Sequence, residues 1–287
     1  MNDHHLNKIQ ELDCWQGELR IVELSGGITN KNYFVEDDVN HYVARICEDR
    51  RHLGIHRDNE RICQQAAQRA GVAPAVLHFK SDLLVTQFIK SRTLTVTDLS
   101  DLTTLTKIAS SLRQLHTAQE HHDGEMLYFC PFQTVRTYAK TASRLNAKLP
   151  TEMDIYLEDA KTLSREITPF RPAMCHNDLL AANLLDDGKR LWIVDWEYAG
   201  VGNPLFDIAS ISANGSLSNE AEAHLLREYA PDFNTQMLHE VKVLKAISLL
   251  REGLWALIQS VASDIEFDYD GYAQDNLTAC SVAKDSL

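Results

Sequence analysis

Two kinds of hydrophobic pattern divide the chain near residue 90. Before this point the apolar residues come in short runs that are rich in β-branched and aromatic side chains and are separated by turn residues, a pattern that is typical of strands. The runs cover residues 20–24, 32–36, 41–47, 75–79 and 83–89. Between the third and fourth runs a helical pattern begins at Asp58 and ends at Ala70, where Gly71 and Pro74 provide stop signals. The first ninety residues therefore predict a small sheet with one helix packed on it.

After residue 90 the apolar positions recur with the period of a helix. The predicted helical segments are 99–117, 131–149, 152–167, 220–229 and 235–262, and an apolar stretch at 172–196 interrupts them. No long Pro-, Gly- or Ser-rich linker separates the two patterns, so we expect two lobes joined by a tight hinge. The prediction is an α+β chain with an N-terminal lobe over residues 1–90 and a larger, mainly helical lobe over residues 91–287.

The charge of the chain limits its partners. Its 41 acidic and 28 basic residues give a net charge of −13 at pH 7, which argues against binding to nucleic acid or to an anionic membrane surface. Neither a membrane span nor a secretory signal is visible, and we expect a cytoplasmic protein. The six cysteines are scattered and show no CxxC spacing, which favours free thiols over disulfides or a structural zinc site.

The sharpest local signal lies at 175–195, where polar residues interrupt an apolar stretch. Asp178 follows His176 by two residues, Asn183 comes five residues later, and Asp195 closes the next apolar run. A carboxylate at Asp178 can orient a substrate hydroxyl group, and Asn183 and Asp195 offer the hard oxygen ligands that Mg²⁺ prefers. These are the parts of a phosphoryl-transfer site. The alternative is an ordinary β-hairpin whose Asp and Asn residues cap turns.

The residues from His176 to Asn183, together with Asp195-Trp196-Glu197-Tyr198-Ala199, resemble the catalytic and metal-binding loops of the choline/ethanolamine kinase and aminoglycoside phosphotransferase superfamily. Members of this superfamily are small-molecule relatives of protein kinases. The resemblance implies a protein-kinase-like two-lobed fold and transfer of the γ-phosphoryl group of ATP. It also implies Asp178 as the catalytic base and Asn183 and Asp195 as ligands of Mg²⁺.

The N-terminal lobe resembles the nucleotide-binding lobe of the same superfamily. The segment 24–33 is similar to its phosphate loop, in which small and polar residues lie near the phosphates. The residues concerned are Ser25, Gly27, Thr29 and Asn30. The segment 84–94 looks like the hinge, where the backbone at Gln87 and Ile89 would bind adenine. The alternative for the phosphate loop is a plain Gly-Gly hairpin turn.

Arg45 occupies the strand position at which protein kinases carry a phosphate-binding lysine, and choline kinases resemble this chain in using arginine there. Its expected partner is Glu60, early on the predicted helix. Alternatively, Glu60 pairs at the surface with a neighbour such as Arg57 or Arg61.

The C-terminal part resembles the tail of choline and ethanolamine kinases, in the segments 253–259 and 265–273. There Trp255 and Tyr272 would offer aromatic faces to a cationic head group, and we also assign Glu197 to the substrate site. The alternative is that Trp255 and Tyr272 are core residues. One departure is Glu252, which stands where relatives often carry a second aromatic residue.

The function that follows is ATP- and Mg²⁺-dependent phosphorylation of a small cationic alcohol, with choline first and ethanolamine next. The alternatives on the same fold are a thiamine kinase and an aminoglycoside phosphotransferase. The alternative outside enzymes is an ATP-binding pseudokinase.

Overall fold

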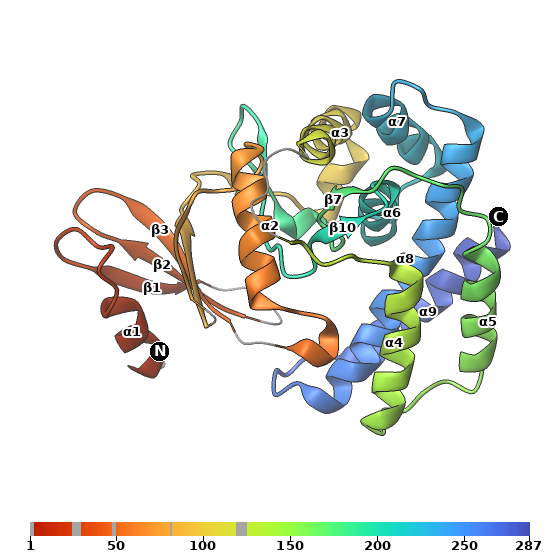
Figure 1. The fold of residues 1–287 in the computed structure, drawn as a ribbon, viewed down its shortest axis with the longest axis horizontal. Coiled ribbons are helices and arrows are strands. Elements are labelled where there is room, and N and C mark those ends of the chain that lie inside the picture. The colour runs from red at the N-terminus through yellow and green to blue at the C-terminus, as the bar shows by residue number, and fades with distance from the viewer. Residues whose placement is uncertain (1–2, 25–29, 48–49, 81, 119–124) are drawn as a thin grey trace.

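The computed structural model describes residues 3–24, 30–47, 50–80, 82–118 and 125–287, and it consists of a sheet lobe and a helical lobe (Figure 1). The sheet has five antiparallel strands in the order β1-β2-β3-β5-β4. Their bounds are β1 (Arg20–Leu24), β2 (Lys31–Glu36), β3 (His41–Ile46), β4 (Val76–Lys80) and β5 (Leu83–Gln87). All five runs predicted as strands contain one, with bounds that agree to within two residues.

Two helices, rather than the predicted one, belong to the sheet lobe. Helix α1 (Asp3–Gln10) packs on the sheet through Ile9, which is fully buried with Tyr33 and Val35. The indole N–H of Trp15 donates a hydrogen bond to the carbonyl of Ile9 (2.7 Å) and ties the end of this helix down. The sequence did not predict this helix, because the segment is short and polar and shows no clear helical pattern. A helix of two turns is stabilised mainly by tertiary contacts.

Helix α2 (Arg57–Arg69) lies between the sheet and the second lobe (Figure 1). It ends at Arg69, next to the predicted end at Ala70, and Gly71 beyond it adopts a left-handed backbone (φ +76°). One face of the helix is polar and nevertheless buried, with Asn59, Glu60 and Gln64 almost inaccessible. A short 3₁₀ turn, η1 (Arg51–Leu53), precedes it.

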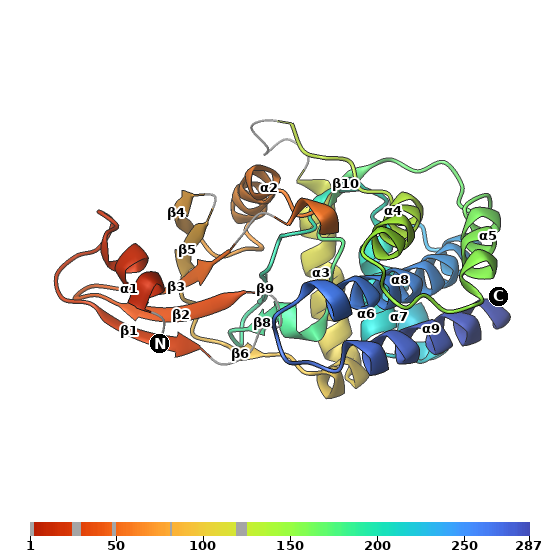
Figure 2. The same ribbon diagram turned by 90° about the horizontal axis from the view of Figure 1, so that it is seen from below.

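The second lobe is mainly helical, as predicted. Helix α8 runs through its centre and packs against α4, α6 and α9 (Figure 2). The helices of this lobe are α3 (Leu102–Thr117), α4 (Pro131–Arg144), α5 (Met153–Leu163), α6 (Leu205–Asn214), α7 (Asn219–Tyr229), α8 (Thr235–Ala262) and α9 (Tyr269–Asp285). None of the described helices is long and apolar enough to cross a bilayer.

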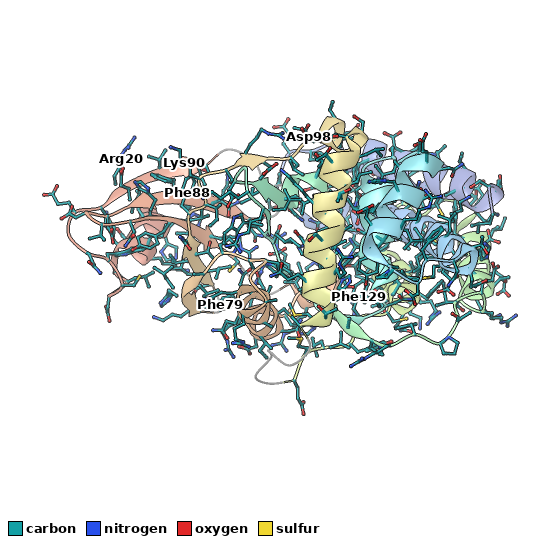
Figure 3. All side chains as sticks on the ribbon, turned by 90° about the horizontal axis from the view of Figure 1, so that it is seen from above. Arg20, Phe79, Phe88, Lys90, Asp98 and Phe129 are labelled. Carbon is teal, nitrogen blue, oxygen red and sulfur yellow. The ribbon has the colours of Figure 1, made fainter. Side chains whose placement is uncertain are left out.

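A short link joins the lobes, and short strands surround the polar motif at 175–195. The link runs from Lys90, beside the sheet, to Asp98, just before α3 (Figure 3). One small sheet has the order β6-β8-β9, and β10 pairs with β7 in another. The elements are β6 (Arg92–Thr93), η2 (Val96–Ser100), β7 (Ala173–Cys175), η4 (Ala181–Asn183), β8 (Leu184–Asp186), β9 (Leu191–Ile193) and β10 (Gly200–Gly202). All six cysteines are free, as expected.

Gly253 allows α9 to pack closely against α8. A Cβ atom at this position would lie 2.9 Å from Cγ of Leu277 and 3.4 Å from the carbonyl oxygen of Ala273. We expect Gly253→Val to lower the free energy of unfolding by about 1–3 kcal/mol through overpacking. Urea denaturation measures the effect, and Ser260→Val, at an exposed position of the same helix, is the matched control. Equal stability of the two variants would contradict the close packing.

Candidate active site

The loop that follows β7 is held in an unusual backbone conformation. Asn177 (φ +63°) and, after β9, Asp195 (φ +68°) both lie in the left-handed region, which costs a residue other than glycine about 1–3 kcal/mol. The carboxylate of Asp207 accepts hydrogen bonds from the backbone N–H groups of His176 (2.8 Å) and Asn177 (2.7 Å). The ring of His176 hydrogen-bonds through Nε2 to the carbonyl of Val194 (3.0 Å). The loop is therefore fixed by buried polar contacts.

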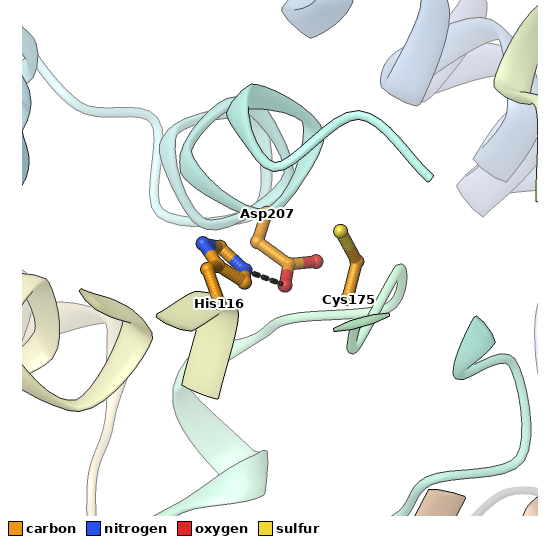
Figure 4. Close-up of side chains that lie close together, drawn as sticks. All are labelled: His116, Cys175 and Asp207. Carbon is orange, nitrogen blue, oxygen red and sulfur yellow. Dashed lines mark hydrogen bonds and ion pairs between the residues drawn. The ribbon is translucent and has the colours of Figure 1, made fainter. Parts of the chain in front are cut away.

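Asp207 is itself held by a buried cluster with His116 and Cys175 (Figure 4). Nε2 of His116 lies 3.0 Å from Asp207 Oδ2, and its Nδ1 lies 2.8 Å from the hydroxyl of Tyr229. Burial acts to raise the pKa of Asp207, but hydrogen bonds from His116 and His176 hold this pKa below its ordinary value. The three side chains are close enough to bind a metal. Because His116 and Asp207 are already engaged with protein partners, we interpret the cluster as a brace for the loop.

Asp178, Asn183 and Asp195 come together at the ends of β8 and β9. Leu184 pairs with Ile193, which places Asn183 opposite Val194, and the N–H of Val194 donates to the carbonyl of Asn183 (3.0 Å). The amide Nδ2 of Asn183 donates to the carbonyl of Asp178 (3.0 Å). The side chains of Asp178 and Asp195 are 20% and 36% exposed. These two carboxylates therefore remain accessible beside the amide of Asn183.

The electrostatics of Asp178 differ from those of an exposed carboxylate. Burial, Glu252 and Asp195 together raise the pKa of Asp178 to about 7, although the positive charge of Arg251 acts in the opposite direction. A carboxylate with a pKa near neutrality is matched to general-base work near pH 7.

The donor set fits a magnesium ion. Because Nδ2 of Asn183 is committed to a carbonyl, its amide oxygen is the atom left to coordinate a cation. Asp195 adds a carboxylate, one oxygen of which accepts a hydrogen bond from Arg45 (2.5 Å). Hard oxygen donors of this kind, few in number, suit Mg²⁺, which keeps waters and phosphate oxygens as its other ligands.

Arg45 belongs to a buried network of ion pairs. It forms ion pairs with Glu60 and Asp195, and Nη1 of Arg57 lies 2.6 Å from Glu60 and 2.7 Å from Glu197. Glu60 is completely buried, so the surface pairing considered for it is wrong. Glu60 contacts the expected Arg45 and also Arg57, which the sequence suggested only as a surface partner.

Glu197, which we expected at the substrate site, is part of this network. Its Oε1 accepts hydrogen bonds from Arg57 and from Nδ2 of Asn30 (2.7 Å). Burial acts to raise its pKa, but the charges of Arg45 and Arg57 hold the pKa of Glu197 below its ordinary value. Asn30 therefore reaches the arginine network from the expected phosphate loop. Ser25, Gly27 and Thr29 lie outside the described residues.

The expected hinge lies between the lobes. Gln87 is the last residue of β5, and its N–H donates to the carbonyl of Ala75 (2.8 Å). Ile89 follows in the link to β6, and the hydroxyl of Ser91 donates to the carbonyl of Ile89 (3.0 Å). The segment is thus ordered by local hydrogen bonds at the position expected for adenine binding.

Trp255 and Tyr272 meet in an aromatic cluster where α8 and α9 pack. Their ring centroids are 6.4 Å apart with the planes at 79°, and Tyr269 and Phe267 complete the cluster. Trp255 is only 8% exposed and belongs to the main core, whereas Tyr272 is partly exposed. The hydroxyl of Tyr272 donates to Glu252 (3.4 Å). The cluster therefore has one wall in the core and a polar end at Glu252.

Arg251 is a site residue that the sequence analysis did not identify. It lies on α8, is 3% exposed, and forms ion pairs with both Asp178 and Glu252. Its guanidinium carbon lies 5.1 Å from the ring centroid of Tyr198. The sequence does carry a signal for it, because Arg251 and Glu252 are two adjacent charged residues inside an otherwise apolar stretch.

A cavity of about 400 Å³ adjoins this region through Tyr198. It lies between the start of α2 and α4, and its aromatic walls are Tyr128, Phe129, Tyr138 and Tyr198. Cavities of this size hold small molecules in other proteins.

Comparison with known proteins points to one family. The family model described as choline/ethanolamine kinase matches residues 21–217. The protein LicA of Haemophilus influenzae is 28% identical over 266 residues, which cover 88% of this chain and 97% of LicA. A choline/ethanolamine kinase family protein from Mesorhizobium loti has the same fold, with a TM-score of 0.82, 27% identity and coverage of 98% and 94%. The choline kinase LicA of Streptococcus pneumoniae also shares the fold, with a TM-score of 0.82, 20% identity and coverage of 99% and 100%.

We expect Asp207→Asn to destabilise the protein by more than about 2 kcal/mol at pH 7, because an amide cannot accept all the hydrogen bonds that the carboxylate receives. Since the folded state lowers this pKa from 3.8, the stabilising contribution is complete above that pH and is lost as the pH falls further. The difference from the wild type should therefore shrink in acid.

Urea denaturation between pH 3 and pH 7 measures this difference. Asp275→Asn, at an exposed position of α9, is the control and should change stability by less than about 0.5 kcal/mol. A difference that does not change with pH would contradict the role of the Asp207 charge.

Proposed function

Since this chain belongs to the choline/ethanolamine kinase family and is therefore a small-molecule kinase that acts on an alcohol group, we propose that it transfers the γ-phosphoryl group of ATP to the hydroxyl group of choline. The observation that carries this proposal is the convergence of Asp178, Asn183 and Asp195 at the ends of β8 and β9. A base beside two oxygen ligands for a cation is the arrangement that phosphoryl transfer requires.

In this proposal each group has a defined task. Asp178 accepts a hydrogen bond from the acceptor hydroxyl and aligns its oxygen for attack on the γ-phosphorus. As the new bond to phosphorus forms, the bond from the γ-phosphorus to the oxygen of ADP breaks, ADP leaves, and Asp178 receives the hydroxyl proton. Arg45 places positive charge beside the phosphates, and Asn30, on the phosphate-loop side, donates to Glu197, which also lies near Arg45. Asn183 and Asp195 would hold Mg²⁺, which neutralises phosphate charge when bound. Gln87 and Ile89 bind the adenine edge through their backbone.

The acceptor lies on the α8 side of Asp178. The ring faces of Trp255 and Tyr272 would bind a trimethylammonium group, and such cation–π contacts stabilise by about 0.5–2 kcal/mol each. Glu252 adds negative charge at the end of this cluster. The aromatic rings and this carboxylate together favour a small cationic alcohol.

Ethanolamine is a second candidate acceptor, which Glu252 favours. Its primary ammonium group can donate hydrogen bonds to a carboxylate, whereas the trimethylammonium group of choline has no N–H to donate. The carboxylate of Glu252 lies 3.4 Å from the hydroxyl of Tyr272, where relatives often place an aromatic ring.

Acceptor-dependent release of ADP tests the function. Choline, ethanolamine, thiamine and an aminoglycoside are compared with ATP and Mg²⁺, and choline should give the highest kcat/KM. Asp178→Ala should lower kcat by about 10²–10⁴-fold because it removes the base, while nucleotide binding remains. Asp275→Ala, an exposed substitution on α9, is the control. Tight ATP binding with no stimulation by any acceptor would instead favour the pseudokinase.

The contacts of Glu197 with the arginine network give a separate prediction. Glu197→Gln removes the negative charge that holds Arg57 and faces Arg45, so the guanidinium groups should shift relative to the phosphates. We expect KM for ATP to rise several-fold while KM for the acceptor changes little. Steady-state kinetics with each substrate varied in turn measures this. A rise in the acceptor KM alone would instead support the assignment of Glu197 to the substrate site.

A further inference from the structure

The side chain of Arg251 contacts the catalytic loop at two points. Its Nη1 donates to the carbonyl of Asn177 (3.1 Å), and its Nη2 pairs with Oδ1 of Asp178. A planar guanidinium that holds both the backbone before Asp178 and one of its carboxylate oxygens restricts the rotation of that side chain. The second carboxylate oxygen is then the one left to meet a substrate hydroxyl.

Arg251 is in turn held from the other side. Glu252, the next residue on α8, pairs with the same Nη2 group and accepts a hydrogen bond from Tyr272. The ring of Tyr198 lies against the guanidinium group. Because Arg251 is 3% exposed and enclosed by these groups, it has little freedom to leave Asp178.

We propose that Arg251 is a positioning residue for phosphoryl transfer: it fixes Oδ1 of Asp178 so that Oδ2 faces the acceptor hydroxyl, and Glu252 keeps Arg251 in place. This inference rests on the proposed function and adds to it a requirement that comes from α8, outside the motif that carries the catalytic residues.

The charge of Arg251 has a consequence for acceptor binding. The guanidinium lies between the carboxylates of Asp178 and Glu252 and offsets one of their two negative charges. Its removal makes the acceptor side more negative, which attracts a cationic alcohol more strongly. Loss of Arg251 therefore lowers the rate of the chemical step without weakening acceptor binding, and a merely structural role would not produce this split.

Arg251→Met and Arg251→Lys test the proposal, with ADP release measured at varied choline and saturating ATP. We expect Arg251→Met to lower kcat by about 10²-fold, the effect of misplacing a catalytic group by about 1 Å, with KM for choline unchanged or lower. Arg251→Lys should recover part of kcat, because lysine restores the charge but cannot span the carbonyl and the carboxylate in the same plane.

Lys245→Met is the matched control. Lys245 also lies on α8 and forms an ion pair with a buried carboxylate, that of Glu222, away from Asp178. This variant should lose stability yet keep the kcat and KM of the wild type. Binding of ADP, followed by fluorescence or calorimetry, confirms that each variant is folded.

The outcomes separate the two proposals. An active wild type whose kcat is unchanged in Arg251→Met overturns the positioning role alone. A fall in kcat that Lys245→Met matches, or that Arg251→Lys does not relieve, also overturns it. A wild type that binds ADP but phosphorylates none of the acceptors overturns the proposed function and, with it, the role of Arg251.

Discussion

The rest of the site depends on a buried network of two arginines and three carboxylates. Arg45 comes from β3, Arg57 and Glu60 from α2, and Asp195 and Glu197 from the segment after β9. These pairs therefore join the sheet, the helix and the second lobe at one point. Breaking a buried pair by removing one partner costs about 3–5 kcal/mol, because it leaves an uncompensated charge. The network fixes how the two lobes face each other.

Among the residues that the structure describes, the network holds three carboxylates and two guanidinium groups, which is one more negative than positive charge. Asp195, the most exposed of its carboxylates, contributes an oxygen that a cation can reach. A divalent ion at this point would be attracted by that excess and would in turn attract the phosphates of a nucleotide. The residues that join the lobes therefore also make the surroundings of Asp195 negative.

Much of this arrangement could be predicted from the sequence. The strands of the sheet and helix α8 show clear periodicity, and the spacing of Asp178, Asn183 and Asp195 identifies the loop. Helix α6 could not be found in this way, because it is buried on all sides and has no polar face to create a periodic pattern.

The contacts of Glu197 and Arg251 could not be predicted for a related reason. Which carboxylate pairs with which arginine is decided by the meeting of distant segments, as for Glu197 with Asn30 and Arg57. Local pattern carries no information on such pairing. Arg251 escaped for the same reason, because its partner Asp178 lies 73 residues away along the chain.

The side chain of Asn59 ties helix α2 to the second lobe. Its amide donates to the carbonyl of Ala199 (2.7 Å) and accepts from the N–H of Leu127 (2.8 Å). Helix α2 is thus bonded to the backbone of two separate segments of the second lobe. In protein kinases the equivalent helix swings outward to switch activity off, which separates its glutamate from the phosphate-binding residue. Here an outward swing would break both of these hydrogen bonds. These two hydrogen bonds therefore oppose such a swing and help to keep Glu60 paired with Arg45.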